Sequence, residues 1–353
     1  MYLPQYHPIK ENDEWWGKGF TEWRNVMKGK QVVPGQYQPH VPADLGFYDL
    51  RVPEVRKQQA ELAKASGIYG FCYYHYWFHG KKMIDRPFND VLSGKEPNFP
   101  FCLCWANESW TRNWDGKEKQ ILLKQEYSAA DDLNHIRYLC SEVFPDDRYI
   151  KVNGKPVFVI YRASSLPNIK QTVAVWRNEA QKAGFPDLHL IHFWAFDYGK
   201  EPTHFDMDAA ALFTPNPIPV PAKGRDWIYK ALHRARIMRN KVSDYRALAN
   251  YCMNMEYPEE YVLYPCITPM WDNYSRRRHG GATIYTHSTP EIYEKWLRSI
   301  CTNWKNNKTE EAFLFINAWN EWAEGNHLEP CEKWKHAYLD ATRNVLTKSI
   351  YSK

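Results

Sequence analysis

Two glutamates, Glu321 and Glu324, stand three positions apart shortly after an apolar run, residues 312–316. Such a run is typical of a buried strand, so polar chemistry begins here where a strand ends. If the chain then turns into helical geometry, both carboxylates face the same side. Cleavage of a glycosidic bond needs two carboxyl groups, one protonated beside the leaving oxygen and one ionised as base or nucleophile. We therefore predict that Glu321 and Glu324 are a catalytic pair that acts on a sugar.

Trp319, Trp322, Asn317 and Asn320 surround the two glutamates in the sequence. Indole rings can form an apolar wall that raises the pKa of one carboxyl group, and amides can keep the other ionised through hydrogen bonds. Asn320 and Trp322 are therefore predicted to contact the substrate. Glutamates at a helix start are also common as caps and dipole partners, which is the structural alternative for this pair.

A second Asn-Glu pair, Asn107-Glu108, follows another apolar run, residues 101–105. Catalytic groups of barrel enzymes come from the ends of several strands, so a pairing of Glu108 with Glu321 stays open. The alternative is that Glu108 orients a substrate hydroxyl or pairs with Arg112.

Polar and aromatic side chains also lie after most other predicted strands and in a long loop over residues 11–44. We predict them as walls and hydroxyl contacts of a carbohydrate cleft, because aromatic rings suit the faces of sugars. Any one of them alone is more typical of a structural role. The predicted substrate-binding residues, besides Asn320 and Trp322, are Tyr6, His7, Trp23, Tyr74, His75, Trp105, Asn107, Glu108, Tyr161, Arg162, Trp194, Trp271 and Asp272.

The elements that must position these residues alternate regularly along the chain. Strands are predicted over 2–6, 68–78, 101–105, 156–161, 188–193, 208–213, 261–268 and 312–317, and helices over 54–66, 129–143, 169–182, 290–304 and 334–346. About eight strands separated by helices or helical insertions predict an α/β fold of the (β/α)8 TIM barrel type.

We expect a single catalytic domain over 1–353, with long loops on its C-terminal face and a helical insertion over 225–256. A doubly wound open sheet is the alternative. The barrel is favoured because it gathers all carboxyl ends of the strands on one rim, whereas an open sheet binds ligands only at its switch point.

Aromatic residues make up 16% of the 353 residues, including 16 Trp and 24 Tyr, which is more than core packing usually needs. They suit ligands such as sugars and nucleobases. The net charge of +5 is modest, and the basic triplet 276–278 is predicted to be a solvated loop, so the charge pattern of a nucleic-acid-binding protein is missing. We predict a carbohydrate partner and no nucleic acid, and no oligomeric state is predicted.

Eight cysteines occur without a C-x-x-C pair, several of them in apolar runs, which favours a reducing compartment. No apolar stretch is long enough to cross a bilayer, and no secretory signal is recognisable. We expect a cytoplasmic location. A periplasmic or secreted location is the alternative, because the sequence begins abruptly in strand-like residues.

No cofactor and no metal site is predicted, because nucleotide-binding, P-loop, zinc-protease and nucleophile-elbow motifs are missing. Asp206 and Asp208 have the spacing of the metal-diphosphate motif of some nucleotide-sugar glycosyltransferases. Such a triplet arises easily by chance, and this one precedes a weak strand.

Four segments together resemble the WbsX-type family, whose members occur in bacterial polysaccharide gene clusters, were labelled glycosyltransferases and are related to glycoside hydrolase family 99. The resemblance runs over nearly the whole chain. The segments are residues 2–8 (YLPQYHP), 11–23 (ENDEWWGKGFTEW), 105–108 (WANE) and 320–325 (NEWAEG).

Family 99 enzymes are (β/α)8 endo-α-mannosidases and endo-mannanases that retain the anomeric configuration. Their Glu-Trp-containing motif carries a base that acts on the sugar 2-hydroxyl to form an anhydro-sugar, followed by an acid/base at the glycosidic oxygen. Carried over, the resemblance implies that Glu321 is the base and Glu324 the acid/base, and it selects this pair over Glu108. Ala323 stands where family 99 enzymes usually carry a histidine, so the sequence matches the WbsX pattern better.

The sequence thus predicts a glycoside hydrolase-like enzyme that acts on a polysaccharide or oligosaccharide. One alternative is a glycosyltransferase of O-antigen, lipopolysaccharide or capsule biosynthesis. The other is a barrel that binds carbohydrate without catalysis.

Overall fold

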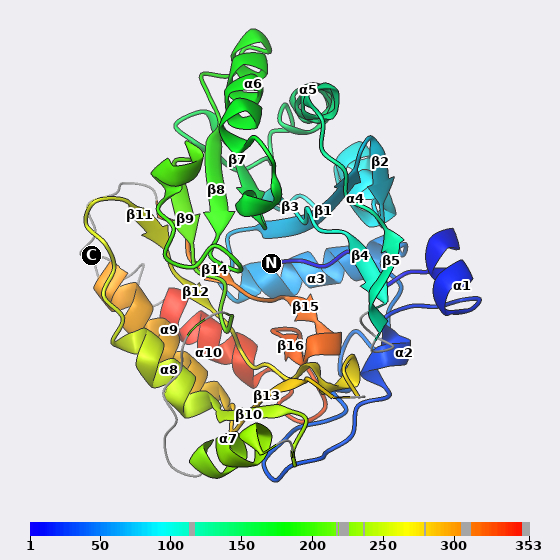
Figure 1. Cartoon of the computed structure of the whole chain (residues 1–353), viewed down its shortest axis with the longest axis vertical. Coiled ribbons are helices and arrows are strands. Elements are labelled where there is room, and N and C mark those ends of the chain that lie inside the picture. Colours follow the sequence, from blue (N-terminus) through cyan, green and yellow to red (C-terminus); the bar gives the residue numbers. More distant parts are fainter. Residues whose placement is uncertain are drawn as a thin grey trace.

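The computed structural model describes residues 1–112, 117–216, 218, 226–235, 237–278, 280–304 and 312–347. Within these residues, helices surround a mainly parallel sheet (Figure 1). The predicted fold is therefore confirmed at the level of a mixed α/β fold with a parallel sheet. None of the helices described is both long and apolar enough to cross a membrane.

The parallel strands follow one another in chain order without a reversal. A doubly wound sheet requires a switch point where the strand order reverses, so this order argues against the alternative fold. The strands are β1 (Phe71–Phe78), β3 (Phe101–Trp105), β7 (Lys155–Ile160), β8 (His189–Phe193), β9 (Ala209–Ala211) and β11 (Val262–Tyr264).

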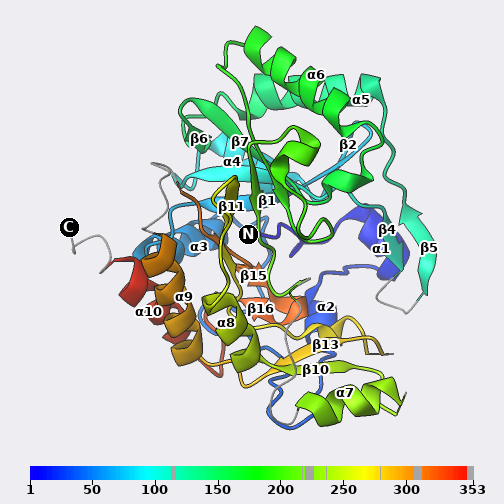
Figure 2. The same ribbon diagram turned by 60° about the vertical axis from the view of Figure 1, so that its left-hand side comes forward.

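Most residues of these strands are apolar or aromatic because parallel strands are covered on both faces. All residues of β3 and β8 are buried. Helices α5 (Ala129–Tyr138) and α6 (Ile169–Lys182) pack side by side over one part of the sheet (Figures 1 and 2). Helix α6 has the predicted bounds, and it buries Val173, Trp176 and Ala180 on one stripe at helical spacing.

Hydrogen bonds join the first residues of the chain to β1 of this sheet and to a separate pair of parallel strands. Tyr2 N donates to Cys72 O (2.8 Å), and Tyr74 N donates to Tyr2 O (2.9 Å). On the other side, the Met1 amine donates to Ile316 O (2.8 Å). Strand β14 (Phe315–Ile316) in turn pairs in parallel with β12 (Cys266–Ile267), which directly follows β11.

The remaining large helices are α3 (Pro53–Ala65), α4 (Arg86–Gly94), α9 (Pro290–Trp304) and α10 (Ala337–Leu346). Pro53 begins α3, a position where its fixed φ suits the helix and its missing N–H has no cost. Helices α8 (Tyr245–Met253), α9 and α10 lie side by side in both views (Figures 1 and 2).

The segment predicted as a helical insertion, 225–256, contains α7 (Asp226–Arg234) and α8 with a strand between them, β10 (Lys241–Asp244). The sequence did not predict this strand, which pairs in parallel with β13 (Thr283–Thr286). Positions 225 and 236 lie outside the described residues.

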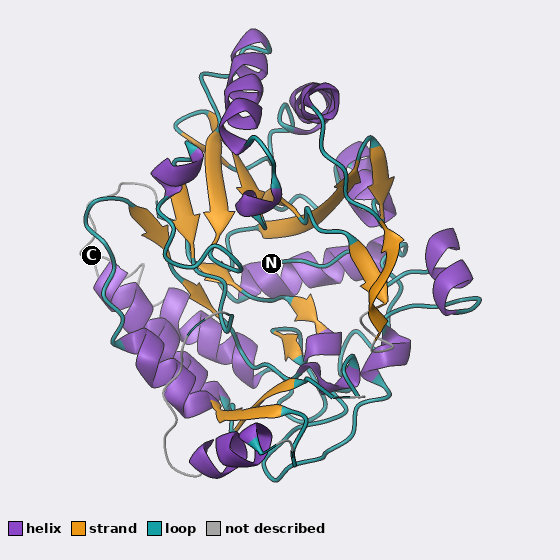
Figure 3. Ribbon diagram, viewed as in Figure 1, coloured by secondary structure: helices purple, strands orange, loops and turns teal. Residues whose placement is uncertain are grey.

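The long loop predicted over 11–44 contains two short helices, α1 (Lys10–Trp16) and α2 (Trp23–Val26), so the expectation of a loop without helices is wrong there. Short strands form antiparallel pairs, some within the large sheet and some separate from it (Figure 3). They form the pairs β1 with β2 (Lys81–Met83), β4 (Trp110–Arg112) with β5 (Lys117–Leu123), β6 (Lys151–Val152) with β7, and β15 (Asn320–Glu321) with β16 (Asn326–His327).

Candidate active site

A tight turn carries the two glutamates. Strand β15 ends at Glu321, a 3₁₀ turn spans Trp322–Glu324, and Gly325 then adopts a positive φ of 55°. A Cβ atom on Gly325 would lie 3.0 Å from the carbonyl oxygen of Asp272, so the turn requires a glycine for space as well as for φ. This geometry aims Glu321 and Glu324 into the same cavity.

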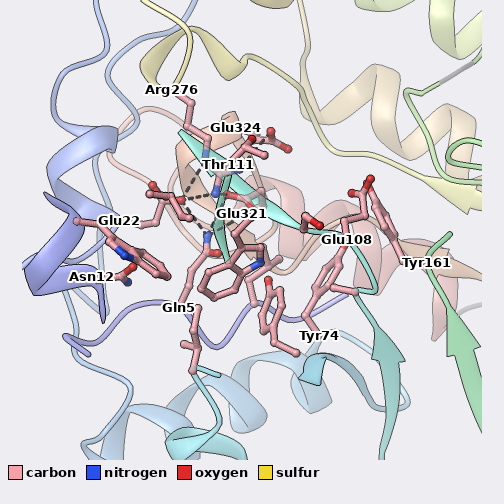
Figure 4. A pocket seen from close by; sticks show the side chains of 18 of the residues that line it. Gln5, Asn12, Glu22, Tyr74, Glu108, Thr111, Tyr161, Arg276, Glu321 and Glu324 are labelled. Atoms are coloured by element: carbon pink, nitrogen blue, oxygen red, sulfur yellow. Dashed lines mark hydrogen bonds and ion pairs between the residues drawn. The ribbon is translucent and has the colours of Figure 1, made fainter. Parts of the chain in front are cut away.

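The cavity has a volume of about 300 Å³, and its wall includes polar and aromatic side chains from several parts of the chain (Figure 4). Of the predicted site residues, it is lined by Tyr74, Glu108, Tyr161, Glu321 and Glu324. Tyr74 lies within β1, opposite Cys104 near the end of β3, whereas Tyr161 directly follows β7 and Glu108 follows β3. The carboxyl ends of parallel strands therefore build one side of this cleft.

Arg276 binds both glutamates. Its Nη2 lies 2.9 Å from Glu321 Oε1, and its Nη1 lies 3.1 Å from Glu324 Oε1. A third carboxylate, Glu22, accepts from Arg276 Nε at 2.9 Å and also contacts Nη2. Only 13% of the Arg276 side chain is exposed, so the prediction that the basic triplet is a solvated loop is wrong for this residue.

Glu22 and Gln5 complete the polar floor of the cleft. Asn25 Nδ2 donates to Glu22 Oε1 at 2.6 Å. Gln5 Nε2 lies 3.3 Å from both Glu22 Oε2 and Glu321 Oε1, so it bridges the two carboxylates. Glu22 precedes α2 without capping it through its side chain, which leaves its carboxylate available to the cleft.

Burial raises the pKa of Glu321 to about 8, although the positive charge of Arg276 opposes this shift. The negative charges of Glu324 and Glu22 add to the increase. Contacts with the same carboxylates raise the pKa of the Arg276 guanidinium despite its burial. One carboxyl group of the pair therefore titrates near neutral pH.

The asparagines beside the glutamates have a different role from the predicted one. Asn320 Oδ1 accepts from Leu3 N (2.8 Å), and its Nδ2 donates to Leu3 O (3.0 Å). Asn317 Nδ2 donates to Thr214 O (2.7 Å). Both amides are thus used to join segments of backbone, and Arg276 and Gln5 are the groups that bind the carboxylates.

Four further predicted residues lie behind the cleft and support it. Tyr6, Trp23 and Trp322 are buried and pack against one another, with Tyr6 and Trp23 rings 4.4 Å apart. The Tyr6 hydroxyl accepts from Trp322 N at 3.0 Å, which holds the start of the 3₁₀ turn. Asn107 exchanges hydrogen bonds with the backbone of Arg162, at 2.8 and 2.9 Å.

Glu108 pairs with Arg162 and not with the predicted Arg112. Its Oε1 lies 2.8 Å from Arg162 Nη1, and the Arg162 guanidinium also lies 4.3 Å from the centre of the Phe196 ring. Arg112 instead lies over the Trp16 ring.

His75 and Trp105 face the helices instead of the cleft. In the parallel register His75 is opposite Trp105, and Tyr74 is opposite Cys104. His75 Nε2 is 3.0 Å from His135 Nε2 in α5, and Trp105 packs against Trp176 in α6. Strand alternation therefore separates these two residues from Tyr74.

The other predicted contacts lie elsewhere. His7 and Trp194 are buried outside the cleft, and burial lowers the pKa of His7 to about 4. Trp271 and Asp272 line a second cavity of about 380 Å³. The 3₁₀ turn separates the cavities, because Glu324 lines the first and Gly325 the second. Burial raises the pKa of Asp272 to about 6.

Several residues of the cleft were not predicted from the sequence. Tyr76 was detectable, because it follows Tyr74 by two positions in the same strand and so shares its face. Asn12, Trp15 and Trp16 come from the short helix α1, Trp110 comes from the short strand β4, and the others come from loops, none of which has a periodic pattern. Lining residues that were not predicted include Gln5, Asn12, Trp15, Trp16, Glu22, Tyr76, Trp110 and Arg276.

Asp206 and Asp208 lie away from the cleft. Asp208 precedes β9, at the opposite end of the sheet from the carboxyl ends, and its Oδ2 lies 2.8 Å from Arg177 Nη2. Asp206 pairs with Lys170 at 3.1 Å. Both carboxylates are thus occupied by structural ion pairs.

Glu329 is a buried carboxyl group that holds the 3₁₀ turn Trp322–Glu324 from behind. It accepts from Trp322 Nε1 (2.7 Å), Tyr48 Oη (2.8 Å) and Gln59 Nε2 (2.6 Å). Burial raises its pKa to about 7 from an ordinary value of 4.5. Between these two pH values the folded carboxyl keeps its proton and the unfolded one loses it, so this group destabilises the fold as pH rises.

Glu329→Gln removes this titration. We expect the variant to be less stable than the wild type, and we expect its deficit in unfolding free energy to narrow by on the order of 2 kcal/mol between pH 5 and pH 8. Urea denaturation of both proteins at the two pH values measures the difference. A deficit that stays constant or widens would contradict the assigned ionisation of Glu329.

Comparisons with known proteins agree with the sequence resemblance. The model of a family described as "Glycosyltransferase WbsX" matches residues 1–342. Two curated relatives, both called "Uncharacterized protein WxcX", come from Xanthomonas campestris pv. campestris strains B100 and ATCC 33913. Each is 42% identical over 354 residues, which cover 99% of this chain and 49% of the relative. The chain therefore spans about half the length of the curated relatives it matches.

Solved structures with a similar fold include two of the GH99 endo-α-mannosidase of Bacteroides thetaiotaomicron. The one in complex with BIS-TRIS-propane has a TM-score of 0.61 at 12% identity, covering 99% of this chain and 96% of that one. The other has a TM-score of 0.58 at 12% identity, covering 100% and 97%. A "Glycoside hydrolase-like protein" has a TM-score of 0.58 at 13% identity, covering 90% and 92%. At these identities the likeness concerns the fold alone.

Proposed function

The chain belongs to the WbsX glycosyltransferase family, and from this membership and the paired carboxylates of its cleft we propose that it is a carbohydrate-active enzyme of the glycoside hydrolase type. The observation that carries the proposal is the presence of Glu321 and Glu324 in one aromatic-walled cavity, bound to one guanidinium group. Two carboxyl groups beside one sugar site are what glycosidic cleavage requires.

We propose that the parallel segments close into a (β/α)8 barrel. Support comes from the hydrogen bonds of Tyr2 to β1 and of Met1 to β14, which continue the ladder across the gap between first and last strands. The likeness to GH99 structures has the same implication. In such a barrel the carboxyl ends of the strands carry the site, in agreement with the positions of Glu108 after β3 and Tyr161 after β7.

In the proposed reaction, Glu321 removes the proton of the sugar 2-hydroxyl, and the resulting oxygen bonds to the anomeric carbon. The bond from that carbon to the leaving oxygen breaks, and Glu324 donates its proton to the leaving oxygen. In the second step Glu324 takes a proton from water, the water oxygen opens the anhydro ring at the anomeric carbon, and Glu321 returns its proton to the 2-oxygen. Two displacements retain the anomeric configuration.

The environment of Glu321 suits a general base. A base works best when its pKa is near the working pH, and burial brings the pKa of Glu321 to about 8. Glu324 is more accessible, with 23% of its side chain exposed compared with 6% for Glu321. The exposed position suits the group that must exchange a proton with the leaving oxygen and then with water.

The family description favours one second candidate, a glycosyltransferase that uses an activated sugar donor. Asp206 and Asp208, which have the spacing of a metal-diphosphate motif, form ion pairs with Lys170 and Arg177 away from the cleft. They therefore do not support this candidate.

The deciding experiment is a paired screen. The chain is incubated with a panel of bacterial surface polysaccharides and α-mannosides, and proton NMR follows the appearance of reducing ends and their initial anomeric form. In parallel, calorimetry measures binding of nucleoside diphosphates with manganese. New reducing ends that retain configuration support the proposal. Tight nucleotide binding without hydrolysis of any glycan would favour the transferase.

A further inference from the structure

Arg276 joins three carboxylates from two distant parts of the sequence, Glu22 and the neighbouring pair Glu321 and Glu324. Glu22 lies before α2, Glu321 ends β15, and Glu324 ends the 3₁₀ turn, while Arg276 follows a different 3₁₀ turn, Asn273–Ser275. Figure 4 shows the guanidinium group above the cleft with the three carboxylates around it. The proposed reaction assigns roles to Glu321 and Glu324 and leaves Arg276 and Glu22 without one.

The contacts of Arg276 are divided between an anchor and the reacting groups. Glu22 takes Nε and shares Nη2, and its other oxygen is held by Asn25 at 2.6 Å. The same Nη2 also reaches Glu321, while Nη1 reaches Glu324. The planar guanidinium fork thus has its orientation fixed by Glu22 and presents its remaining donors to the catalytic pair.

The ionisation of Glu321 depends on Arg276, because the other charged groups around this carboxyl are negative. In the part of the chain that the structure describes, the charged and titratable groups around the Glu321 carboxyl include Arg276, Glu22 and Glu324, together with the phenols of Tyr6, Tyr74 and Tyr76. The uncharged Gln5 Nε2 also donates to this carboxyl at 3.3 Å. Arg276 carries the positive charge in this set. A buried carboxylate without a cation takes up a proton, and a protonated Glu321 cannot act as a base.

We propose that Arg276, anchored by Glu22, is a positioning residue that favours the ionised form of Glu321 and directs it toward the cleft. This inference rests on the proposed function for its catalytic meaning. Its electrostatic part concerns the free protein and can be tested without a substrate. Arg276 and Glu22 should act on Glu321 in opposite directions, because one is a cation and the other an anion.

Carbon-13 NMR of protein labelled at the glutamate carboxyl carbon measures this directly, with the Glu321 signal identified by its loss in Glu321→Gln. In Arg276→Gln we expect the titration midpoint of Glu321 to rise by at least one pH unit. The ionised fraction at pH 7 and kcat/KM would then fall about tenfold. In Glu22→Gln we expect the midpoint to fall, because a negative neighbour is removed and Arg276 is left to the catalytic pair.

Arg278→Gln is the matched control, because this neighbouring arginine is exposed and its loss should leave the midpoint unchanged. An unchanged midpoint in a folded Arg276→Gln variant, or shifts of the same sign in Arg276→Gln and Glu22→Gln, would overturn the proposal. If Arg276→Gln does not fold, the downward shift in Glu22→Gln supports the proposal, and any other result rejects it. Failure to find a hydrolysed glycan would reject the proposed function and leave this titration result standing.

Discussion

Replacing Glu321 with glutamine is expected to lower kcat/KM by about 10³-fold, the middle of the range for loss of a general base. Glutamine keeps the shape of the side chain and cannot accept the proton of the sugar 2-hydroxyl. Arg276 retains Glu22 and Glu324 as partners in this variant, so the protein should fold and bind glycan. Steady-state kinetics on a glycan identified in the screen, together with binding calorimetry, measure both expectations.

Glu108→Gln is the control for this prediction, because Glu108 is another carboxylate in the same cavity. Its partner is Arg162 and it has no contact with Arg276, so we expect a weaker effect, mainly on KM. If Glu108→Gln lost more activity than Glu324→Gln, catalysis would instead use the pair Glu108 and Glu321. A substrate without a 2-hydroxyl should not be cleaved, and its cleavage would exclude the anhydro-sugar route.

The arrangement of the strands was predictable because buried parallel strands are uninterrupted apolar runs bounded by turn residues. The strand predicted over 101–105 has the bounds of β3, and the helix predicted over 169–182 has those of α6. The short helices α1 and α2 were not predicted, because four- and seven-residue helices stabilised by neighbouring loops leave no periodic pattern.

The sequence predicts which side chains of a strand share a face, but it does not predict which of the two faces lines the cleft. Alternation shows that Tyr74 and Tyr76 share one face of β1 and that His75 belongs to the other. Because both faces of this strand are covered, the sequence contains no polar-apolar contrast that tells the inner face from the outer one. The prediction therefore included His75 and Trp105, which pack against α5 and α6.

The burial of Arg276 could not be predicted from its neighbours. Three consecutive arginines are typical of a solvated loop, and Arg278 is indeed exposed. Arg276 is buried because Glu22, 254 positions earlier, together with Glu321 and Glu324, supplies enough negative charge to compensate for the loss of water. Ion pairs at such separations become visible only when the chain is folded.

Replacing Glu324 with glutamine is expected to have an effect that depends on the leaving group. A glycan leaves as a poor alkoxide and needs the proton of an acid, so kcat/KM should fall about 10³-fold. An aryl glycoside of the same sugar with a nitrophenol leaving group departs as a stable anion, so its first step should be nearly as fast as in the wild type. Pre-steady-state kinetics should then show a burst of nitrophenol, because water still lacks its base in the second step.

Glu321→Gln provides the matched comparison on the same two substrates. Attack by the 2-oxygen requires the base whichever group leaves, so this variant should lose activity on both substrates and show no burst. Arg276 binds both carboxylates, so its contacts do not distinguish the base from the acid. The variants Glu321→Gln and Glu324→Gln distinguish these two roles. Equal losses of Glu324→Gln on both substrates would show that Glu324 does not protonate the leaving oxygen, and a burst in Glu321→Gln would exchange the two assignments.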